Sequence, residues 1–230
     1  MPTYRDSSGR SLVDYPRPSV AVDTAALTVP PGGALVVLLV RSGDTWRLPG
    51  TFLHEGETLV EAVLRSLRDK VGVTGLSPQQ LHVYDDPTRD ERGWVLSVAH
   101  VDAVPPDRLI PDAERARLTD VDALPPLPYG HEHIIERAVR FLRAQYESAP
   151  DPAGLLASPF TLRELQSLHE AVAGTGLPKD SFRRAMEGAL RATGQSATGS
   201  LGKPARLFVI DQTSRSGRAA KQLASPFMSE

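Results

Sequence analysis

Basic side chains near the C-terminal end of the 230-residue chain are the first candidates for a chemical role. Between Lys179 and Lys221 the sequence holds nine Lys and Arg residues against three Asp and Glu residues. The adjacent Arg183 and Arg184 carry guanidinium groups, which commonly read O6 and N7 of guanine in the DNA major groove. Such a basic excess is typical of a surface that binds DNA phosphates, and it is equally typical of a solvated face.

The elements that must position these side chains follow a recognisable order. Thr161 is a suitable N-cap for a first helix over Leu162–Val172, where apolar residues recur at helical spacing. A turn at Gly174–Pro178 leads to a second helix. A Gly- and Ser-rich stretch over Gly194–Gly202 then precedes a strand over Ala205–Ile210. Helix, turn, helix, hairpin and strand in this order predict a winged helix-turn-helix.

The second helix carries the arginine pair. It is predicted to begin with Asp180 or Ser181 as its N-cap and to end at Gly194. Its inward residues are expected to be Phe182, Ala185, Met186, Ala189 and Leu190. Because the second helix of such a motif enters the major groove, its outward side chains are predicted to face DNA. The predicted DNA-binding residues are Thr161, Lys179, Ser181, Arg183, Arg184, Arg191, Lys203 and Arg206.

Within this set, Lys179, Lys203 and Arg206 are better suited to phosphates than to bases, and the last two belong to the wing. Single winged helices bind DNA weakly, so we expect a homodimer on a palindromic operator of double-stranded DNA. The alternative for this half is a helical dimerisation module.

The N-terminal half alternates predicted strands and helices, so it is an α/β or α+β domain, and α+β is the expected fold class of the chain. Residues 19–27 and 34–40 form a predicted strand pair, and residues 94–104 a further strand. Residues 57–71 form an amphipathic helix that ends at Gly72, and residues 132–146 form a second helix. The Pro-containing segment 148–154 is a predicted linker between two domains.

Composition excludes several classes of protein. The chain has no cysteine, so disulfides, thiolate metal sites and zinc fingers are excluded. The longest apolar run, residues 34–40, is far shorter than the roughly 20 residues of a membrane span, and the first ten residues show no signal peptide. We therefore expect a cytoplasmic, nucleoid-associated protein without a membrane partner.

A motif in the N-terminal half resembles the Nudix box, G-x5-E-x7-R-E-U-x-E-E-x-G-U. It comprises Leu48-Pro-Gly-Thr-Phe52, Glu57-Thr-Leu and Arg65-Ser-Leu-Arg-Asp-Lys-Val-Gly-Val73. The spacing is intact, so the resemblance implies a Nudix-type α/β/α sandwich. It also implies that Glu57 and Arg65 brace the loop against the helix, the alternative being a plain surface ion pair.

The departures from this motif fall on its chemistry. Thr51 stands for the first Gly, and Ser66, Asp69 and Lys70 stand for the three glutamates that gather Mg²⁺ in Nudix hydrolases. A lysine places an ammonium where a divalent cation would lie, with a repulsion of about 4 kcal/mol per unit charge at ~4 Å and an effective dielectric near 20. We expect no enzyme activity, no catalytic residue, no bound metal and no cofactor. The alternative is an ADP-ribose or NADH pyrophosphatase with displaced carboxylates at Glu55, Glu57, Glu61 and Asp69.

Two further stretches resemble Nudix proteins that handle ADP-ribose and NAD-related compounds. They are the segment over residues 84–98, which contains Asp-Pro-Thr-Arg-Asp-Glu-Arg-Gly, and Pro128-Tyr-Gly-His131, in which Gly130 replaces an Asp. Arg89 and Arg92 suit a pyrophosphate or ribose, or else they pair with Asp85, Asp86 or Asp90 to brace their loop. His131 is a ligand contact or a core histidine. The ligand-binding residues that the resemblance implies are Arg47, Phe52, Glu57, Asp86, Arg89, Arg92 and His131.

Three C-terminal motifs extend the resemblance to nearly the whole chain. Phe160-Thr-Leu-Arg-Glu-Leu-Gln-Ser-Leu-His169, Lys179-Asp-Ser-Phe-Arg-Arg184 and Gly202-Lys-Pro-Ala-Arg-Leu-Phe208 resemble the Nudix-related transcriptional regulators of NAD metabolism, the NrtR family. The resemblance implies a repressor of NAD biosynthesis or salvage genes that senses ADP-ribose or a related nucleotide. A sensor that regulates a protein partner is a further alternative. The expected domains are an effector-sensing domain over residues 1–150, a DNA-binding domain over 151–211 and a disordered tail over 212–230.

Overall fold

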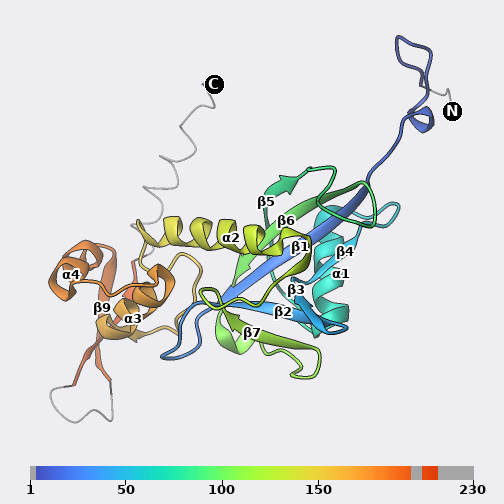
Figure 1. Ribbon diagram of the computed structural model, residues 1–230. Coiled ribbons are helices and arrows are strands. Elements are labelled where there is room, and N and C mark those ends of the chain that lie inside the picture. Colours follow the sequence, from blue (N-terminus) through green and yellow to red (C-terminus); the bar gives the residue numbers. More distant parts are fainter. Residues whose placement is uncertain (1–3, 198–203, 212–230) are drawn as a thin grey trace.

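The computed structural model describes residues 4–197 and 204–211, which form two sheets with their covering helices (Figure 1). The N-terminal half contains β1 (Ser19–Thr28), β2 (Val36–Ser42), β3 (Thr45–Arg47), β4 (Gly50–Phe52), α1 (Leu59–Val71), β5 (Gln79–Tyr84), β6 (Val95–Ala103), β7 (Ala116–Asp120) and α2 (His131–Tyr146). The C-terminal half contains β8 (Phe160–Thr161), α3 (Leu162–Ala173), α4 (Lys179–Glu187), β9 (Leu190–Ser196) and β10 (Arg206–Ile210). Short 3-10 turns lie at η1 (Leu12–Asp14), η2 (Pro106–Arg108) and η3 (Pro128–Gly130).

The long strand β1 is the centre of the larger sheet. It pairs in parallel with β6 along nearly its whole length, and it pairs antiparallel with β2 near one end and with β4 near the other. The strand order is β3-β2-β1-β6-β5, with β4 beside β1 and β7 beside β2. The predicted strand pair is confirmed by the antiparallel register of Leu27 with Val37.

Alternate residues of the central strands face two different helices. Leu27 and Leu39 pack in the core beneath α2, while Ala26 and Leu38 pack in the core beneath α1. Because successive side chains of a strand point to opposite faces, this places one helix on each side of the sheet (Figure 1). The predicted α/β/α sandwich is confirmed. No helix in the described ranges is long and apolar enough to cross a membrane.

Helix α1 starts at Leu59, two residues after the predicted start at Glu57, and ends before Gly72 as predicted. Thr58 and Glu61 form a reciprocal capping box at the N-terminus, and Gly72 ends the helix in the left-handed conformation with φ 69°. The buried side of the helix faces the sheet, while Val60 in the first turn is exposed. The start of the helix is therefore fixed at the end of the loop that carries the Nudix-box glutamate.

The C-terminal half is a winged helix, as predicted. Its three-stranded sheet has the order β8-β10-β9, and its core joins Phe160 and Leu165 to Phe182 and Met186 of α4. Thr161 caps α3 through a second capping box with Glu164.

The predicted beginning of the second helix is wrong by two or three residues. Helix α4 starts at Lys179 after Pro178, which has no side-chain cap, so neither Asp180 nor Ser181 is the N-cap. Proline fits this place because its fixed φ and its missing N–H cost a helix nothing at the first position or before it. Ala185, expected to face inward, is exposed.

The predicted end of this helix is also wrong. Helix α4 ends at Glu187, and Gly194 lies inside strand β9. Leu190 and Arg191 are therefore not helical, because their backbone pairs with β10. The local sequence suits a helix, but hydrogen bonding to a neighbouring strand overrides that preference.

The predicted linker over residues 148–154 has no helix or strand, yet it is packed between the two halves. The carboxylate of Asp151 is buried and accepts hydrogen bonds from the Tyr146 hydroxyl at 2.6 Å and from the two backbone N–H groups of residues 155 and 156. His169 Nε2 of α3 donates to the Pro150 carbonyl at 2.6 Å, because a carbonyl oxygen can only accept, and the His169 ring contacts Tyr146 edge-on. The ends of α2 and α3 thus share one core.

Candidate functional site

A cleft of about 170 Å³ opens where β1, the loop from β3 to β4, α1 and the turn before α2 meet. Glu57 and Asp86 are not part of its lining, and the Asp86 carboxylate instead accepts hydrogen bonds from Thr88. The other five predicted ligand-binding residues line it: Arg47, Phe52, Arg89, Arg92 and His131. The rest of the lining, which sequence did not indicate as ligand contacts, consists of Ala21, Asp23, Leu48, Gly50, Thr51, Lys70, Asp90 and Tyr129.

A buried carboxylate and a buried imidazole form the floor of the cleft. The Ser97 hydroxyl donates to Asp23 at 2.5 Å, and His131 Nε2 lies 3.4 Å from the same carboxylate. Because His131 Nδ1 accepts the Leu48 N–H at 3.0 Å, the neutral ring carries its proton on Nε2, toward Asp23. Burial by itself raises the pKa of Asp23, but hydrogen bonding and attraction from His131, with the Ser97 hydrogen bond, bring that pKa below its ordinary value.

His131 is therefore a core histidine that also borders the cleft. It is 2% exposed, and both of its ring nitrogens have partners within the protein. Its role is to fix the loop at Leu48 against β1. Asp23 had one signal in the sequence, since it is the single charged residue in a long apolar strand.

Arg92 lies between two aromatic rings and is anchored by a carboxylate. It donates two hydrogen bonds to Asp90, at 2.8 and 2.6 Å, and its guanidinium carbon lies 4.4 Å from the ring centre of Tyr129 and 5.3 Å from that of Phe52. The hydrogen bonds from Arg92 hold the pKa of Asp90 below its usual range. Arg92 therefore braces its loop through Asp90, which was one of the two roles considered for it. Its guanidinium also lines the cleft.

The backbone of Tyr129 takes an unusual conformation to make these contacts. Its φ is 61°, in the left-handed region that is uncommon for residues other than glycine, and Gly130 follows with φ 65°. This turn directs the Tyr129 carbonyl to Arg89, which donates to it at 2.8 Å. The two arginines of the loop before β6 are therefore both fixed by the segment that opens α2.

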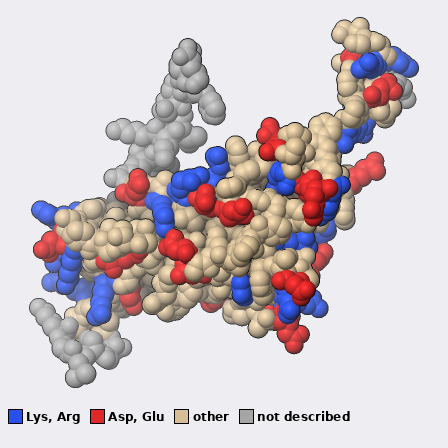
Figure 2. Space-filling view, in the orientation of Figure 1, with Lys and Arg blue, Asp and Glu red and all other residues tan. Residues whose placement is uncertain are grey.

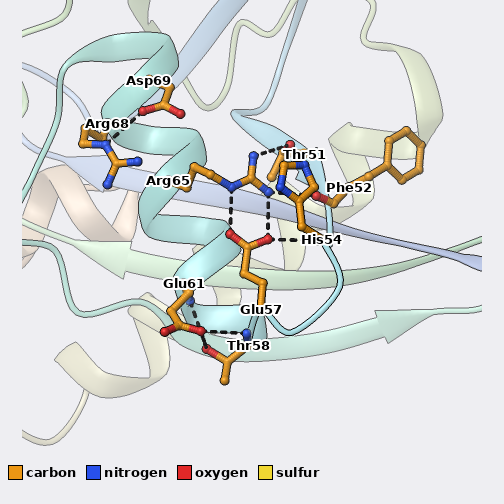
Figure 3. Close-up of polar contacts among 9 residues, drawn as sticks. All are labelled: Thr51, Phe52, His54, Glu57, Thr58, Glu61, Arg65, Arg68 and Asp69. Atoms are coloured by element: carbon orange, nitrogen blue, oxygen red, sulfur yellow. Dashed lines mark hydrogen bonds and ion pairs between the residues drawn. The ribbon is translucent and has the colours of Figure 1, made fainter.

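Glu57 and Arg65 connect the Nudix-box loop to α1 (Figure 3). Arg65 donates two hydrogen bonds to the Glu57 carboxylate, at 2.7 and 2.8 Å, and another to the Phe52 carbonyl at 3.0 Å. The hydrogen bond from Arg65 is the main reason that the pKa of Glu57 falls to about 2. The bracing geometry expected for this pair is confirmed.

The side chains at the three positions that hold glutamates in Nudix hydrolases lie in three different environments. Ser66 is buried, and among the described residues its hydroxyl has no hydrogen-bond partner. Asp69 points away from the cleft, with its side chain 55% exposed, and pairs with Arg68 at 2.9 Å (Figure 3). Lys70 alone of the three lines the cleft, where its ammonium donates to the Gly50 carbonyl.

The carboxylates weighed as displaced metal ligands do not converge. Glu57 is bound to Arg65, Glu61 belongs to the capping box of Thr58, and Asp69 is paired at the surface. Glu55 is exposed in the loop before α1. Within residues 4–197 and 204–211, no group of three or more His, Asp or Glu side chains could hold a metal ion.

A second candidate site is the basic surface of the winged helix. Figure 2 shows Lys and Arg side chains gathered at the end of the molecule where α4 and β9 lie in Figure 1. Lys179, Ser181, Arg183 and Arg184 are all exposed on α4. Arg183 lies 3.6 Å from Glu187, and both side chains are 61% exposed, so the pair is open to competition from another anion.

The remaining predicted DNA-binding residues lie elsewhere. Arg191 and Arg206 are exposed on β9 and β10, the strands of the wing, so the placement of Arg191 on the second helix is corrected. Thr161 is only 9% exposed and its hydroxyl accepts the backbone N–H of Glu164, which makes it a cap. Lys203 lies outside the described residues.

Comparison with known proteins identifies both halves. Residues 18–138 match the NUDIX domain family, and residues 152–210 match the family described as the NrtR DNA-binding winged helix domain. The ADPR responsive transcriptional repressor NtrR of Acinetobacter baylyi is 30% identical over 208 residues, covering 85% of this chain and 83% of the relative.

Solved structures agree with this assignment. Shewanella oneidensis NrtR complexed with a 27mer DNA is 31% identical with a TM-score of 0.70, covering 86% of this chain and 95% of that chain. The NUDIX domain of Shewanella oneidensis NrtR complexed with ADP ribose is 26% identical with a TM-score of 0.51, covering 59% of this chain and 95% of that chain. The chain therefore belongs to the NrtR family, in which a Nudix domain is joined to a DNA-binding winged helix.

Proposed function

We propose that this protein is a transcriptional repressor that binds operator DNA through its winged helix and releases it when ADP-ribose, or a related nucleotide, occupies the Nudix cleft. The observation that carries the proposal is the union, in one chain, of a cation-lined Nudix cleft with an exposed basic helix. The relatives support it, since one is named as an ADPR responsive repressor and the structures of another contain DNA or ADP ribose. We assign residues 1–150 to effector sensing and 151–211 to DNA binding.

The cleft suits a diphosphate better than a hydrolytic reaction. Arg47, Arg89 and Arg92 offer guanidinium groups that bind phosphate oxygens in fixed geometry. Sites for drug-sized ligands are roughly 300–1,000 Å³, so a cleft of about 170 Å³ encloses only part of an ADP-ribose molecule. We place the diphosphate inside it and the outer groups beside Phe52 and Tyr129. Binding without turnover follows because Ser66 and Lys70 cannot act as the metal-binding glutamates.

DNA binding is assigned to a homodimer on a palindromic operator. A single winged helix offers a small interface, and a two-fold axis doubles the contacts while matching the symmetry of the site. We place Arg183 and Arg184 in the major groove and Lys179, Arg191 and Arg206 on phosphates. The regulated genes are those of NAD biosynthesis or salvage, and the protein acts at the nucleoid.

Two assays test this function together. Operator fragments are selected from random duplexes, and their binding to the full chain is followed by fluorescence anisotropy at fixed salt while ADP-ribose is added. Release of DNA without release of AMP supports the proposal. Rapid Mg²⁺-dependent release of AMP from ADP-ribose would instead assign the chain to the pyrophosphatases. Absence of any sequence-specific DNA binding would favour a sensor that acts on a protein partner.

A further inference from the structure

We propose that the Lys70 ammonium takes the place of the divalent cation in this Nudix cleft, so that a diphosphate binds without any metal ion. The inference rests on the proposed function, since it concerns how the same cleft holds its effector. The Nudix fold occurs in Mg²⁺-dependent enzymes, but the residues of this chain do not fit Mg²⁺.

The misfit with Mg²⁺ is visible at each position. Mg²⁺ requires several oxygen ligands near 2.0–2.1 Å in octahedral geometry. Ser66 is buried without charge, and Asp69 is turned to the surface beside Arg68. The carboxylates that do border the cleft are already bound, Asp23 to Ser97 and His131 and Asp90 to Arg92.

Lys70 is fixed in a definite place rather than free in solvent. Its side chain is partly buried, and its ammonium donates to the carbonyl of Gly50, the first residue of β4, which packs beside α1. Gly50 is held closely against β1, because a Cβ at this position would lie 2.0 Å from Asp23 Oδ1 and 2.7 Å from the Val22 carbonyl oxygen. Strand β4 therefore presents the Gly50 carbonyl to Lys70 in a preset orientation.

The charge of Lys70 is available to an anion. No ion pair joins Lys70 to a carboxylate anywhere in the described part of the chain. A lysine ammonium has three donors, and Gly50 uses one of them. With Arg47, Arg89 and Arg92, Lys70 brings the cations around the cleft to four. The carboxylates of Asp23 and Asp90 offset two of them, and the remaining positive charge complements the two negative charges of a diphosphate.

Calorimetric titration of the full-length protein tests the inference. ADP-ribose and inorganic pyrophosphate are each titrated in EDTA and again in MgCl₂. For the wild type we expect the dissociation constants in EDTA and in MgCl₂ to agree within about twofold. A twofold difference corresponds to ~0.4 kcal/mol of binding free energy. The charge-free variant Lys70→Met should lose about tenfold or more in affinity in EDTA, on the order of the ~1.4 kcal/mol that a tenfold change represents.

Three further variants sharpen the result. Lys70→Arg keeps the positive charge and should retain most of the affinity. Lys70→Glu should bind poorly in EDTA and recover affinity when Mg²⁺ is added, because a carboxylate at this position restores a metal ligand. Arg68→Met is the matched control on an exposed position of the same helix, and it should bind like the wild type. Circular dichroism and thermal melting establish that each variant is folded.

The outcomes separate this inference from the proposed function. A wild type that needs Mg²⁺ for binding, or a folded Lys70→Met variant that binds like the wild type, overturns the role of Lys70. Binding of pyrophosphate in EDTA that depends on Lys70, without binding of ADP-ribose, upholds the inference and overturns the proposed effector. Failure of both compounds to bind in either condition overturns both.

Discussion

The cations of the cleft and the cations of the winged helix are presented in opposite ways. In the cleft, Lys70 donates to Gly50, Arg89 donates to Tyr129, and Arg92 is bound by Asp90 between two rings. On α4 and the wing, the basic residues project from exposed positions, and their internal contacts are few and long, as in the pair of Arg183 with Glu187 at 3.6 Å.

This difference indicates what each region recognises. Fixed donors around a small cavity lose little conformational entropy on binding, so they suit one compact anion and discriminate by geometry. Exposed side chains can adjust to a long, uniformly charged duplex, and their binding energy depends strongly on salt. The two regions are therefore expected to respond differently to mutation, pH and ionic strength.

Removal of both arginines of α4 is expected to have the largest effect, and it acts on DNA binding alone. In the double variant Arg183→Ala/Arg184→Ala we expect operator affinity to fall at least ~30-fold, because each arginine that contacts a base contributes about 1–3 kcal/mol. Fluorescence anisotropy at fixed salt measures the loss. The melting temperature and ADP-ribose affinity should stay unchanged. Wild-type DNA affinity in the double variant would place the recognition surface elsewhere.

Asp151 tests whether the two regions are joined as one unit. Asp151→Asn puts an amide group against the donors that the buried carboxylate now accepts, so we expect the protein to lose about 1–3 kcal/mol of unfolding free energy. Urea denaturation measures this loss, with the exposed Glu147→Gln as a control. We also expect ADP-ribose to bind normally but to release DNA less completely. A variant with unchanged stability and unchanged release would mean that Asp151 is not part of the connection.

The brace of Glu57 and Arg65 gives the stability of the Nudix domain a dependence on pH. The pKa of Glu57 is about 2, below the ordinary value of 4.5, so its stabilisation is complete above pH 4.5 and is lost as the pH falls toward 2. Glu57→Gln should therefore lower the urea midpoint at neutral pH, with a difference from wild type that shrinks in acid. Glu55→Gln, in the same loop and exposed, is the matched control. A difference that persists at the acid end would contradict this account.

Lys179 gives the smallest expected effect and the sharpest contrast in salt dependence. If Lys179 contacts one phosphate, Lys179→Ala should reduce the slope of log affinity against log salt by about 0.9 and weaken all duplexes to the same degree. The slope is measured by anisotropy across a salt series. ADP-ribose binding should show no such change in slope between this variant and the wild type. An unchanged slope for DNA would remove Lys179 from the interface.

The sequence determined a large part of this fold through local rules. The reciprocal caps at Thr58 and Thr161, the left-handed glycine at Gly72 and the helical spacing of apolar residues fixed α1 and α3 within the chain itself. Motif spacing and element order identified the Nudix loop and the winged helix, and the family resemblance implied five residues of the cleft lining. These features depend on residues only a few positions apart, so no tertiary contact is needed to predict them.

Tertiary structure decided the features that join distant segments. The partnership of Asp23 with His131, the left-handed turn at Tyr129 and the place of Lys70 against Gly50 arise only when β1, α1 and the turn before α2 meet. Arg191 lies on a strand instead of a helix for the same reason, because pairing with β10 outweighs its local preference. Local sequence sets the secondary-structure propensity of each segment. Burial and strand pairing depend on the whole fold, and they determine which charged side chains are fixed by contacts within the protein and which remain exposed to a ligand.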